Sequence, residues 1–257
     1  MLYTTRAFLS GSKLCPLGKD MALFWRQYVL YHRPLLCLSV TPFFNAFARL
    51  TGRNLPQSNA AGFDEDQILA KSLETKELVV CETIVVCKLM CSVIFREMDE
   101  AERLTREYLE LFEKHDGAGF LQFVNIYRYF YGGLTAFDRY RRIRDQYWRD
   151  IGERAVSKLE AWTRECEWTF QNKLLLLQAE QQFATGQVPE ATQTYNLAIA
   201  SARDHRFVHE EALSLELASG FYEQTGQREK STYLLQQAKE RYEMWGATEK
   251  AKSLVAI

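Results

Sequence analysis

Apolar residues recur every three or four positions along most of this chain from about residue 64 onward, which is the spacing of one face of an α-helix. In one such segment Asp99 is followed three positions later by Glu102, a pair that resembles a capping box and predicts a helix over 99–115 starting at Asp99. A longer helix is expected over 139–165, where apolar side chains stand four positions apart. Before residue 64 the pattern is less regular and predicts helices over 17–32 and 34–50.

The remaining local signals also favour helices over strands. No stretch of useful length alternates between apolar and polar residues, as a half-buried strand does. Glycine (13) and proline (5) are scarce in 257 residues, so tight turns are few. We therefore expect an all-α protein, with irregular N-terminal helices over 1–62 and a helical repeat domain over 63–257 that together form one continuous array.

The last third of the chain contains an internal repeat. Gly186 and Gly226 each follow a helical segment, at a position typical of a helix end. Ala198 and Ala238 each stand twelve positions after these glycines, where a small side chain lets two antiparallel helices approach closely. Helix, glycine turn and helix predict a tetratricopeptide-like helix-pair solenoid. The repeat is degenerate, because its period is longer than that of the tetratricopeptide family and no tryptophan stands at its head.

Near the end of the chain the sequence predicts the end of one helix and the start of another. Trp245 and Gly246 close one helix, and Thr248 is a candidate N-cap for a final helix over 249–257. A solenoid needs its last repeat covered, so we expect this helix to pack over Tyr242 and Trp245 and hide the indole. The alternative is that its apolar side is a docking face for another domain.

The charge, the length of the apolar runs and the cysteine spacing argue against several classes of protein for this sequence, among them nucleic-acid-binding, membrane-spanning and disulfide-bonded secreted proteins. The 32 Lys and Arg balance 33 Asp and Glu, so no net field attracts nucleic acid or an anionic membrane. No apolar run reaches the ~18 residues of a membrane helix, which predicts a soluble chain without a membrane partner. Six cysteines with no disulfide-like spacing indicate reduced thiols. A basic start without acids before Asp20 faintly resembles a mitochondrial presequence, but Gly11, Pro16 and Gly18 interrupt it, so we expect a cytoplasmic protein.

Tests for catalytic and metal-binding motifs find none. Gly18-Lys19 lacks the earlier glycine and the following hydroxyl residue of a phosphate-binding loop. His205 and His209 fall at the end of one predicted helix and the start of the next, which predicts solvated or capping histidines rather than metal ligands. The acidic run 64–66 is explained by a charged helix start. We therefore expect a protein that is not an enzyme and needs no cofactor or metal.

One basic and aromatic segment is a candidate interaction site. Its arginines alternate with Asp138, Asp145 and Asp150, so a solvated helix face with internal Arg–Asp pairs is the ordinary interpretation. The five arginines exceed the three aspartates by two, which marks a candidate partner-binding patch. The patch comprises Arg139, Arg141, Arg142, Arg144, Trp148 and Arg149.

Several sequence stretches carry a resemblance to a known family. They are Tyr195-Asn-Leu-Ala-Ile-Ala-Ser-Ala-Arg203, Phe207-Val-His-Glu-Glu-Ala-Leu213, Trp245-Gly-Ala247 and, upstream, Phe130-Tyr-Gly-Gly-Leu134. The chain resembles the helical-repeat region of large signalling proteins that combine a Ser/Thr-kinase-like domain, an AAA/STAND-type ATPase, a GAF sensor and a histidine kinase. The resemblance implies a region without catalytic residues that links the ATPase to the sensor and kinase parts. It also implies a fragment or detached descendant of such a protein.

Together these observations predict a non-catalytic helical-repeat module for protein–protein or interdomain contacts in signal transduction. Its partner would be a protein segment or a neighbouring signalling domain taken up in a concave groove. Two alternatives remain open at this point. One is a helical enzyme with an unrecognised site, and the other is nucleic-acid binding through 139–149, which the balanced charge disfavours.

Overall fold

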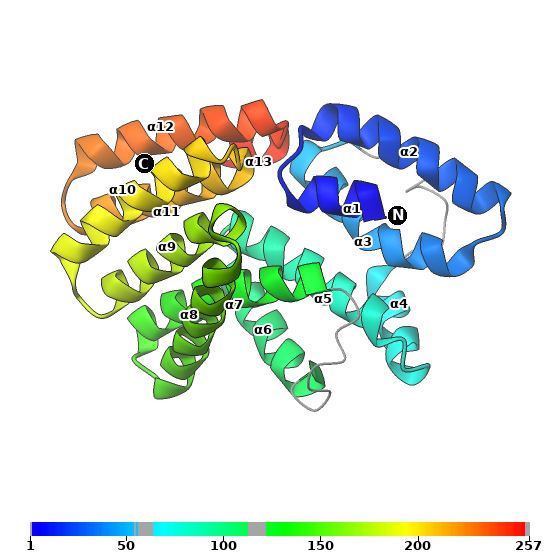
Figure 1. The fold of residues 1–257 in the computed structure, drawn as a ribbon, viewed down its shortest axis with the longest axis horizontal. Coiled ribbons are helices and arrows are strands. Elements are labelled where there is room, and N and C mark those ends of the chain that lie inside the picture. The colour runs from blue at the N-terminus through cyan, green and yellow to red at the C-terminus, as the bar shows by residue number, and fades with distance from the viewer. Residues whose placement is uncertain (1, 54, 56–63, 113–121, 255–257) are drawn as a thin grey trace.

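The computed structural model describes residues 2–53, 55, 64–112 and 122–254, and within these ranges every regular element is a helix. This confirms the all-α class (Figure 1). The helices are α1 (Leu2–Leu9), α2 (Leu14–Leu30), α3 (Pro34–Thr51), α4 (Glu65–Glu74), α5 (Leu78–Ile94), α6 (Met98–Phe112), α7 (Gln122–Ile143), α8 (Gln146–Glu165), α9 (Glu167–Ala184), α10 (Val188–Asp204), α11 (Val208–Gln224), α12 (Arg228–Trp245) and α13 (Thr248–Ser253).

The helices are arranged in two layers. The odd-numbered helices α3, α5, α7, α9 and α11 pack one on the next, and the even-numbered helices α4 to α12 flank them. The final helix α13 packs on α12 and also on α3, so the two ends of the array meet (Figure 1). The odd-numbered helices form an inner layer that curves around almost to closure.

A left-handed residue marks nearly every reversal between helices. At the C-terminal end such residues stand at regular intervals, at positions 186, 206, 226 and 246, with φ angles of 83°, 62°, 80° and 97°. At the first of these turns the Gly186 and Gln187 amides donate to the carbonyls of Phe183 and Gln182, which satisfies the end of α9. The sequence indicates only the glycines of this series. Arg206 adopts the same conformation as a non-glycine residue and hides the regular spacing.

The two alanines of the repeat are buried in the helix pairs of the C-terminal end. Ala198 on α10 and Ala238 on α12 are completely buried, where α10 packs on α9 and α12 on α11. Around them the buried rings of Tyr195, Tyr222 and Phe221 fill the interior. The helices of each pair, α9–α10 and α11–α12, therefore pack closely on one another.

Two helix boundaries differ from those expected from the sequence. The long helix expected over 139–165 is wrong, because the chain breaks at Arg144, whose φ is 57°. Asp145 then caps α8 by accepting a hydrogen bond from the Tyr147 amide at 3.0 Å. Asp99 does not cap α6, since that helix begins one residue earlier at Met98 and Asp99 lies in its first turn.

The N-terminal part of the chain packs against Trp245. The indole Nε1 donates to the Ser12 carbonyl at 3.2 Å, and the ring centroid of Phe8 lies 6.4 Å from that of Trp245. The sequence did not predict this contact with the N-terminal helices. The last helix packs on α12, as expected, and brings Lys250 Nζ within 5.4 Å of the ring centroid of Tyr242. Thr248 is the first residue of α13 and not its N-cap, which is Ala247, so that expectation is wrong. The Thr248 hydroxyl donates to the Thr51 carbonyl at 2.9 Å, which fixes the start of α13 to the end of α3. Residues 255–257 of the expected final helix lie outside the described residues.

One hydrophobic cluster runs through both parts of the chain. It includes buried residues from Phe8 and Phe47 in the N-terminal helices to Ala251 in α13. The expected boundary between 62 and 63 lies outside the described residues. Among the helices that the structure describes, none is both long and apolar enough to traverse a bilayer.

Candidate functional site

The structure separates the six residues of the basic and aromatic segment. Trp148 is completely buried, so its indole faces no solvent. Arg139 is also buried and pairs with Asp99 and Glu102 of α6. Arg144 donates to the carbonyl of Ala184. These six side chains therefore do not form one exposed surface.

The other three arginines make local ion pairs. Arg149 pairs with Glu153 one turn further along α8, at 2.7 Å. Arg141 and Arg142 both pair with Asp138, at 2.9 and 3.0 Å. Because carboxylates on the same and neighbouring helices neutralise these guanidiniums, the excess of two arginines counted along the segment largely disappears in the fold. Arg141 remains of interest because it faces a cavity.

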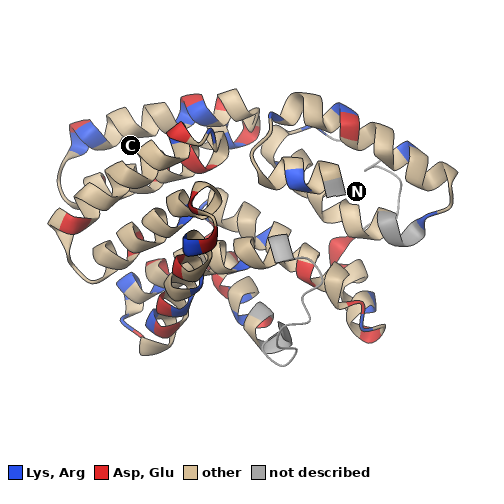
Figure 2. Ribbon diagram, viewed as in Figure 1, with Lys and Arg blue, Asp and Glu red and all other residues tan. Residues whose placement is uncertain are grey.

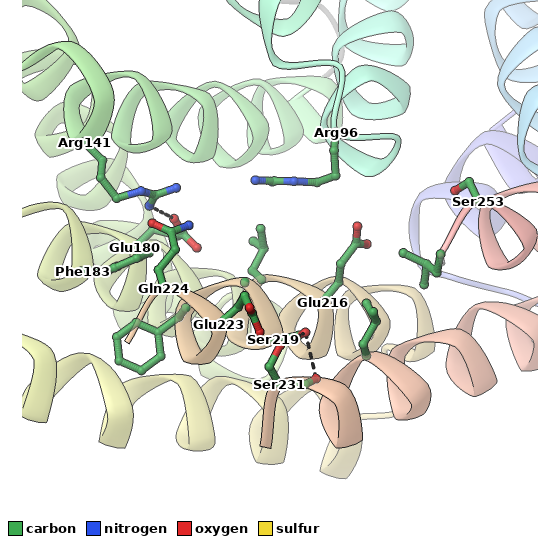
Figure 3. A pocket seen from close by; sticks show the side chains of 15 residues that line it. Arg96, Arg141, Glu180, Phe183, Glu216, Ser219, Glu223, Gln224, Ser231 and Ser253 are labelled. Atoms are coloured by element: carbon green, nitrogen blue, oxygen red, sulfur yellow. Dashed lines mark hydrogen bonds and ion pairs between the residues drawn. The ribbon is translucent and has the colours of Figure 1, made fainter. Parts of the chain in front are cut away.

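This cavity lies on the inner layer of helices and has a volume of about 310 Å³ (Figure 3). Such a volume is at the lower end of ligand-binding sites. Its wall comes from the α5–α6 turn, α7, α9, α11, α12 and the end of α13. Polar side chains stand beside apolar ones on this wall. The lining residues are Arg96, Arg141, Glu180, Phe183, Glu216, Leu217, Ser219, Gly220, Phe221, Glu223, Gln224, Ser231, Leu235, Ser253 and Leu254.

Two of the carboxylates in the cavity wall are held by a cation and a tyrosine each. The first, Glu180, accepts from Arg141 at 3.0 Å and from the Tyr195 hydroxyl at 2.6 Å. Burial and the charge of Glu180 raise the pKa of Tyr195 well above its usual value, so that this phenol stays a donor. Arg141 also lies over the ring of Phe183, 4.3 Å from its centroid. These side chains are fixed by one another and shape the wall.

The second carboxylate, Glu216, is held in the same way. It accepts from Lys250 of α13 at 2.7 Å and from the Tyr242 hydroxyl at 2.9 Å. Burial lowers the pKa of Lys250, while the charge of Glu216 opposes that shift. The ion pair therefore fastens α13 to α11 at the edge of the cavity.

Arg96 differs from these paired side chains. It occupies the left-handed position of the α5–α6 turn, with φ 61°, and its guanidinium points into the cavity (Figure 3). Within the described part of the chain its one ion pair is with Asp138, at 3.6 Å, which is too long for a hydrogen bond. Asp138 is already shared by Arg141 and Arg142. Among the charged residues that line the cavity, Glu180 is held by Arg141 and Glu216 by Lys250, whereas Arg96 has no carboxylate within hydrogen-bond distance among the described residues.

None of the cysteines and histidines that the structure describes lines the cavity. Burial raises the pKa of Cys91 to about 12 and that of Cys87 well above its usual value, so both remain protonated thiols. His205 ends α10 with its ring 4.2 Å from that of Trp168. His209 is buried against Trp245, with Nε2 3.4 Å from Glu210, so the expectation of a solvated or capping histidine is wrong for this residue.

The three acidic side chains at the start of α4 each have a different partner. Asp64 caps the helix by accepting from the Asp66 amide at 2.9 Å. Asp66 pairs with Lys88 of α5, and Glu65 accepts from Asn45 of α3. Over the ranges that the structure describes, no three His, Cys, Asp or Glu side chains lie together as metal ligands would.

Sequence reasoning missed Arg96, Glu180 and Glu216. Glu216 carries a signal, since it is the one charge in the otherwise uncharged stretch Leu213–Ala218. Arg96 stands 20 positions after Lys76, and the left-handed positions 186, 206, 226 and 246 of the later turns are also 20 apart. This spacing was hidden in the sequence because neither the turn at Lys76 nor that at Arg96 contains a glycine at the left-handed position. Comparison with family models, with curated proteins and with solved structures finds no match for this chain.

Proposed function

We propose that this chain is a non-catalytic, tetratricopeptide-like repeat module that binds an extended segment of a partner protein at the inner-layer cavity. The two-layer arrangement and the regular recurrence of the turns support the tetratricopeptide-like interpretation. The signalling role and the cytoplasmic location rest on the resemblance to multidomain sensor kinases and on the cysteine content. The paired arginines of 139–149 disfavour nucleic acid as the partner.

The observation that carries the proposal is the guanidinium of Arg96. It points into the cavity, and it has no hydrogen-bonded carboxylate of its own among the described residues (Figure 3). A carboxylate from a partner segment would accept a charge-assisted hydrogen bond there. Ser219, Gln224 and Phe183 offer polar and apolar contacts to the rest of such a segment. The preferred partner is therefore a short peptide segment with an acidic residue.

Arg96→Gly tests this proposal without disturbing the turn. Glycine adopts a φ of 61° freely, so the substitution removes the guanidinium while relieving backbone strain. Lys76→Gly is the matched control, because Lys76 occupies the same position in the preceding turn and lies outside the cavity. A random peptide library selected on the unaltered chain supplies the ligands, and their affinities are measured by calorimetry or fluorescence anisotropy.

We expect the selected peptides to contain an acidic residue and to bind Arg96→Gly about tenfold or more weakly, since hydrogen bonds to charged groups contribute roughly 1.5–3 kcal/mol. Binding to Lys76→Gly should equal that of the unaltered chain. Peptides that bind all three proteins equally, or a selection that yields no acidic peptides, would refute the proposal.

A further inference from the structure

The helix α2 has two faces of different chemistry. Its inner face is anchored by Leu17, Met21 and Trp25, and the Trp25 ring centroid lies 5.3 Å from that of Phe44 in α3. The helix packs on α1 and α3, and Figure 1 places it on the outer edge of the molecule. The opposite face is therefore open, and it centres on Leu23 and Leu30, which stand two turns apart.

These two leucines belong to a larger exposed apolar surface. Leu23 is 54% exposed and Leu30 is 69% exposed. Val29 and Tyr31 beside them, and Tyr3 of α1, are 54%, 67% and 61% exposed. Tyr31 directly follows α2, and the ring centroid of Tyr3 lies 6.5 Å from that of Phe24 on α2. Single exposed apolar residues are ordinary on protein surfaces, but such a cluster indicates an interaction site. We call these five residues the α2 apolar surface.

Basic residues border this surface, and acidic ones are nearly absent. On α2 itself, Lys19 and Arg26 stand on either side of Leu23, and both are exposed. Residues 1–53 contain seven Lys and Arg but only one acidic residue, Asp20 (Figure 2). The rest of the chain contains 25 Lys and Arg and 32 Asp and Glu. The net charge of −1 thus conceals a strongly basic N-terminal segment.

We propose that the α2 apolar surface binds the surface of an anionic phospholipid bilayer. Exposed Leu and Val side chains on a helix that also carries exposed Lys and Arg, with tyrosines beside it, have the composition of segments that lie in the membrane interface. Protein partners that bind a helix enclose it in a groove. The α2 apolar surface instead lies on an outer helix that is already packed on α1 and α3, which favours a flat partner such as a membrane surface. The leucines would enter the acyl boundary, the tyrosines would lie at the level of the headgroups, and Lys19 and Arg26 would contact lipid phosphates.

This inference does not depend on the proposed function. The cavity lies on the inner layer of helices, whereas the α2 apolar surface faces outward. A membrane-bound chain would still present its cavity to a protein segment. The sequence predicted no membrane partner from the net charge and from the lack of a membrane-spanning run. Neither quantity shows where the charges lie on the surface of the folded chain.

Flotation of the full chain with vesicles tests the proposal. We expect binding to vesicles of phosphatidylcholine with 30 mol% phosphatidylserine, and much weaker binding to pure phosphatidylcholine. High salt should weaken the binding, because it screens the lysines and arginines. Equal binding to both kinds of vesicle, or no binding to either, would overturn the proposal.

Substitutions separate the apolar from the electrostatic contribution. Leu23→Ser with Leu30→Ser should reduce the partition coefficient at least about tenfold, since two leucines lose their burial in the bilayer. The matched control replaces Leu197 and Tyr233 by Ser, which are similarly exposed on α10 and α12, and should leave binding unchanged. Lys19→Gln and Arg26→Gln should each reduce binding about fivefold, against no change for Lys158→Gln on α8. Equal losses in the control variants would refute the proposal.

Two further measurements distinguish the remaining outcomes. Thermal unfolding must show that the variants fold as the unaltered chain does, which is expected because all the replaced side chains are exposed. Analytical ultracentrifugation measures association of the chain with itself. A dimer that Leu23→Ser with Leu30→Ser dissociates, together with no vesicle binding, would assign the surface to a second copy of the chain and overturn the membrane proposal.

Discussion

Buried carboxylates in this protein differ in whether a cation accompanies them. Burial alone would raise the pKa of Glu210, but the charges of Lys173 and His209 outweigh that effect and lower it to about 2. The stability that this carboxylate contributes is present above its unfolded pKa of about 4.5 and is lost as the pH falls through 2. Glu65 forms no ion pair with the residues that the structure describes, and burial raises its pKa to about 7 despite the hydrogen bond from Asn45 and the charges of Lys88 and Arg49. The two groups therefore give stability opposite dependences on pH.

Glu65→Gln should make the protein more stable at pH 8, by about 1–3 kcal/mol, and change little below pH 4.5. A carboxyl whose pKa is raised on folding favours the folded state while protonated, and that advantage is lost as the pH rises from 4.5 through 7. Melting temperatures between pH 4 and 8 measure the effect. Glu74→Gln, an exposed position on the same helix, is the control and should parallel the unaltered chain. A Glu65→Gln profile that also parallels it would contradict the assignment.

At the scale of helices, the pairs α9–α10 and α11–α12 depend on small residues at their crossings. Ala198 and Ala238 are completely buried, and each stands twelve positions after a left-handed glycine. The turn fixes where the second helix begins, and the alanine fixes how closely it approaches the first. Both constraints occur in each pair at the same relative positions, so that the two pairs have similar geometry.

Ala198→Leu and Ala238→Leu should each destabilise the protein by about 1–3 kcal/mol, because three added carbons have no space at a closed crossing. Ala200→Leu introduces the same atoms on the exposed side of α10 and should stay within about 0.5 kcal/mol of the unaltered chain. Urea unfolding midpoints provide the comparison. If the two buried variants unfold like Ala200→Leu, the crossings do not lie at these alanines.

At the scale of the whole molecule, the N-terminal helices close the array against its C-terminal end. Trp245 is covered by Phe8 and donates to Ser12, while Thr248 donates to Thr51. These contacts join segments from opposite ends of the sequence. The closure covers an end of the array that would otherwise expose apolar surface.

Gly11→Ala tests this closure against a matched position. Gly11 and Gly186 have similar φ angles of 77° and 83°, so alanine costs about 1–2 kcal/mol of backbone strain at either one. At Gly11 the new Cβ would also lie 2.0 Å from Nδ1 of the buried His209, whereas at Gly186 it would meet nothing within 4 Å. Urea unfolding should show Gly11→Ala to be the less stable variant by about a further 1–3 kcal/mol. Equal losses would mean that the N-terminal turn does not pack on α11.

The sequence by itself determined the local features of this protein. Apolar spacing predicted the helices because successive turns of a helix bring the same face back to the core, and glycine marked the turns at Gly186 and Gly226 because its left-handed backbone is unstrained. Arg144 and Arg206 adopt the same backbone without such a marker, and for that reason one helix boundary and the regular spacing of the turns escaped prediction.

Only the tertiary structure decided which distant residues meet. The cavity joins Arg96 to Glu216, and the closure joins Ser12 to Trp245, across separations for which a single sequence contains no periodic signal. Whether an arginine is available to a ligand depends on carboxylates supplied by other helices. These pair Arg139 and Arg141 but leave Arg96 without a close partner among the described residues. The candidate site is therefore defined by which arginines are paired in the fold, and the order of residues along the chain does not show this.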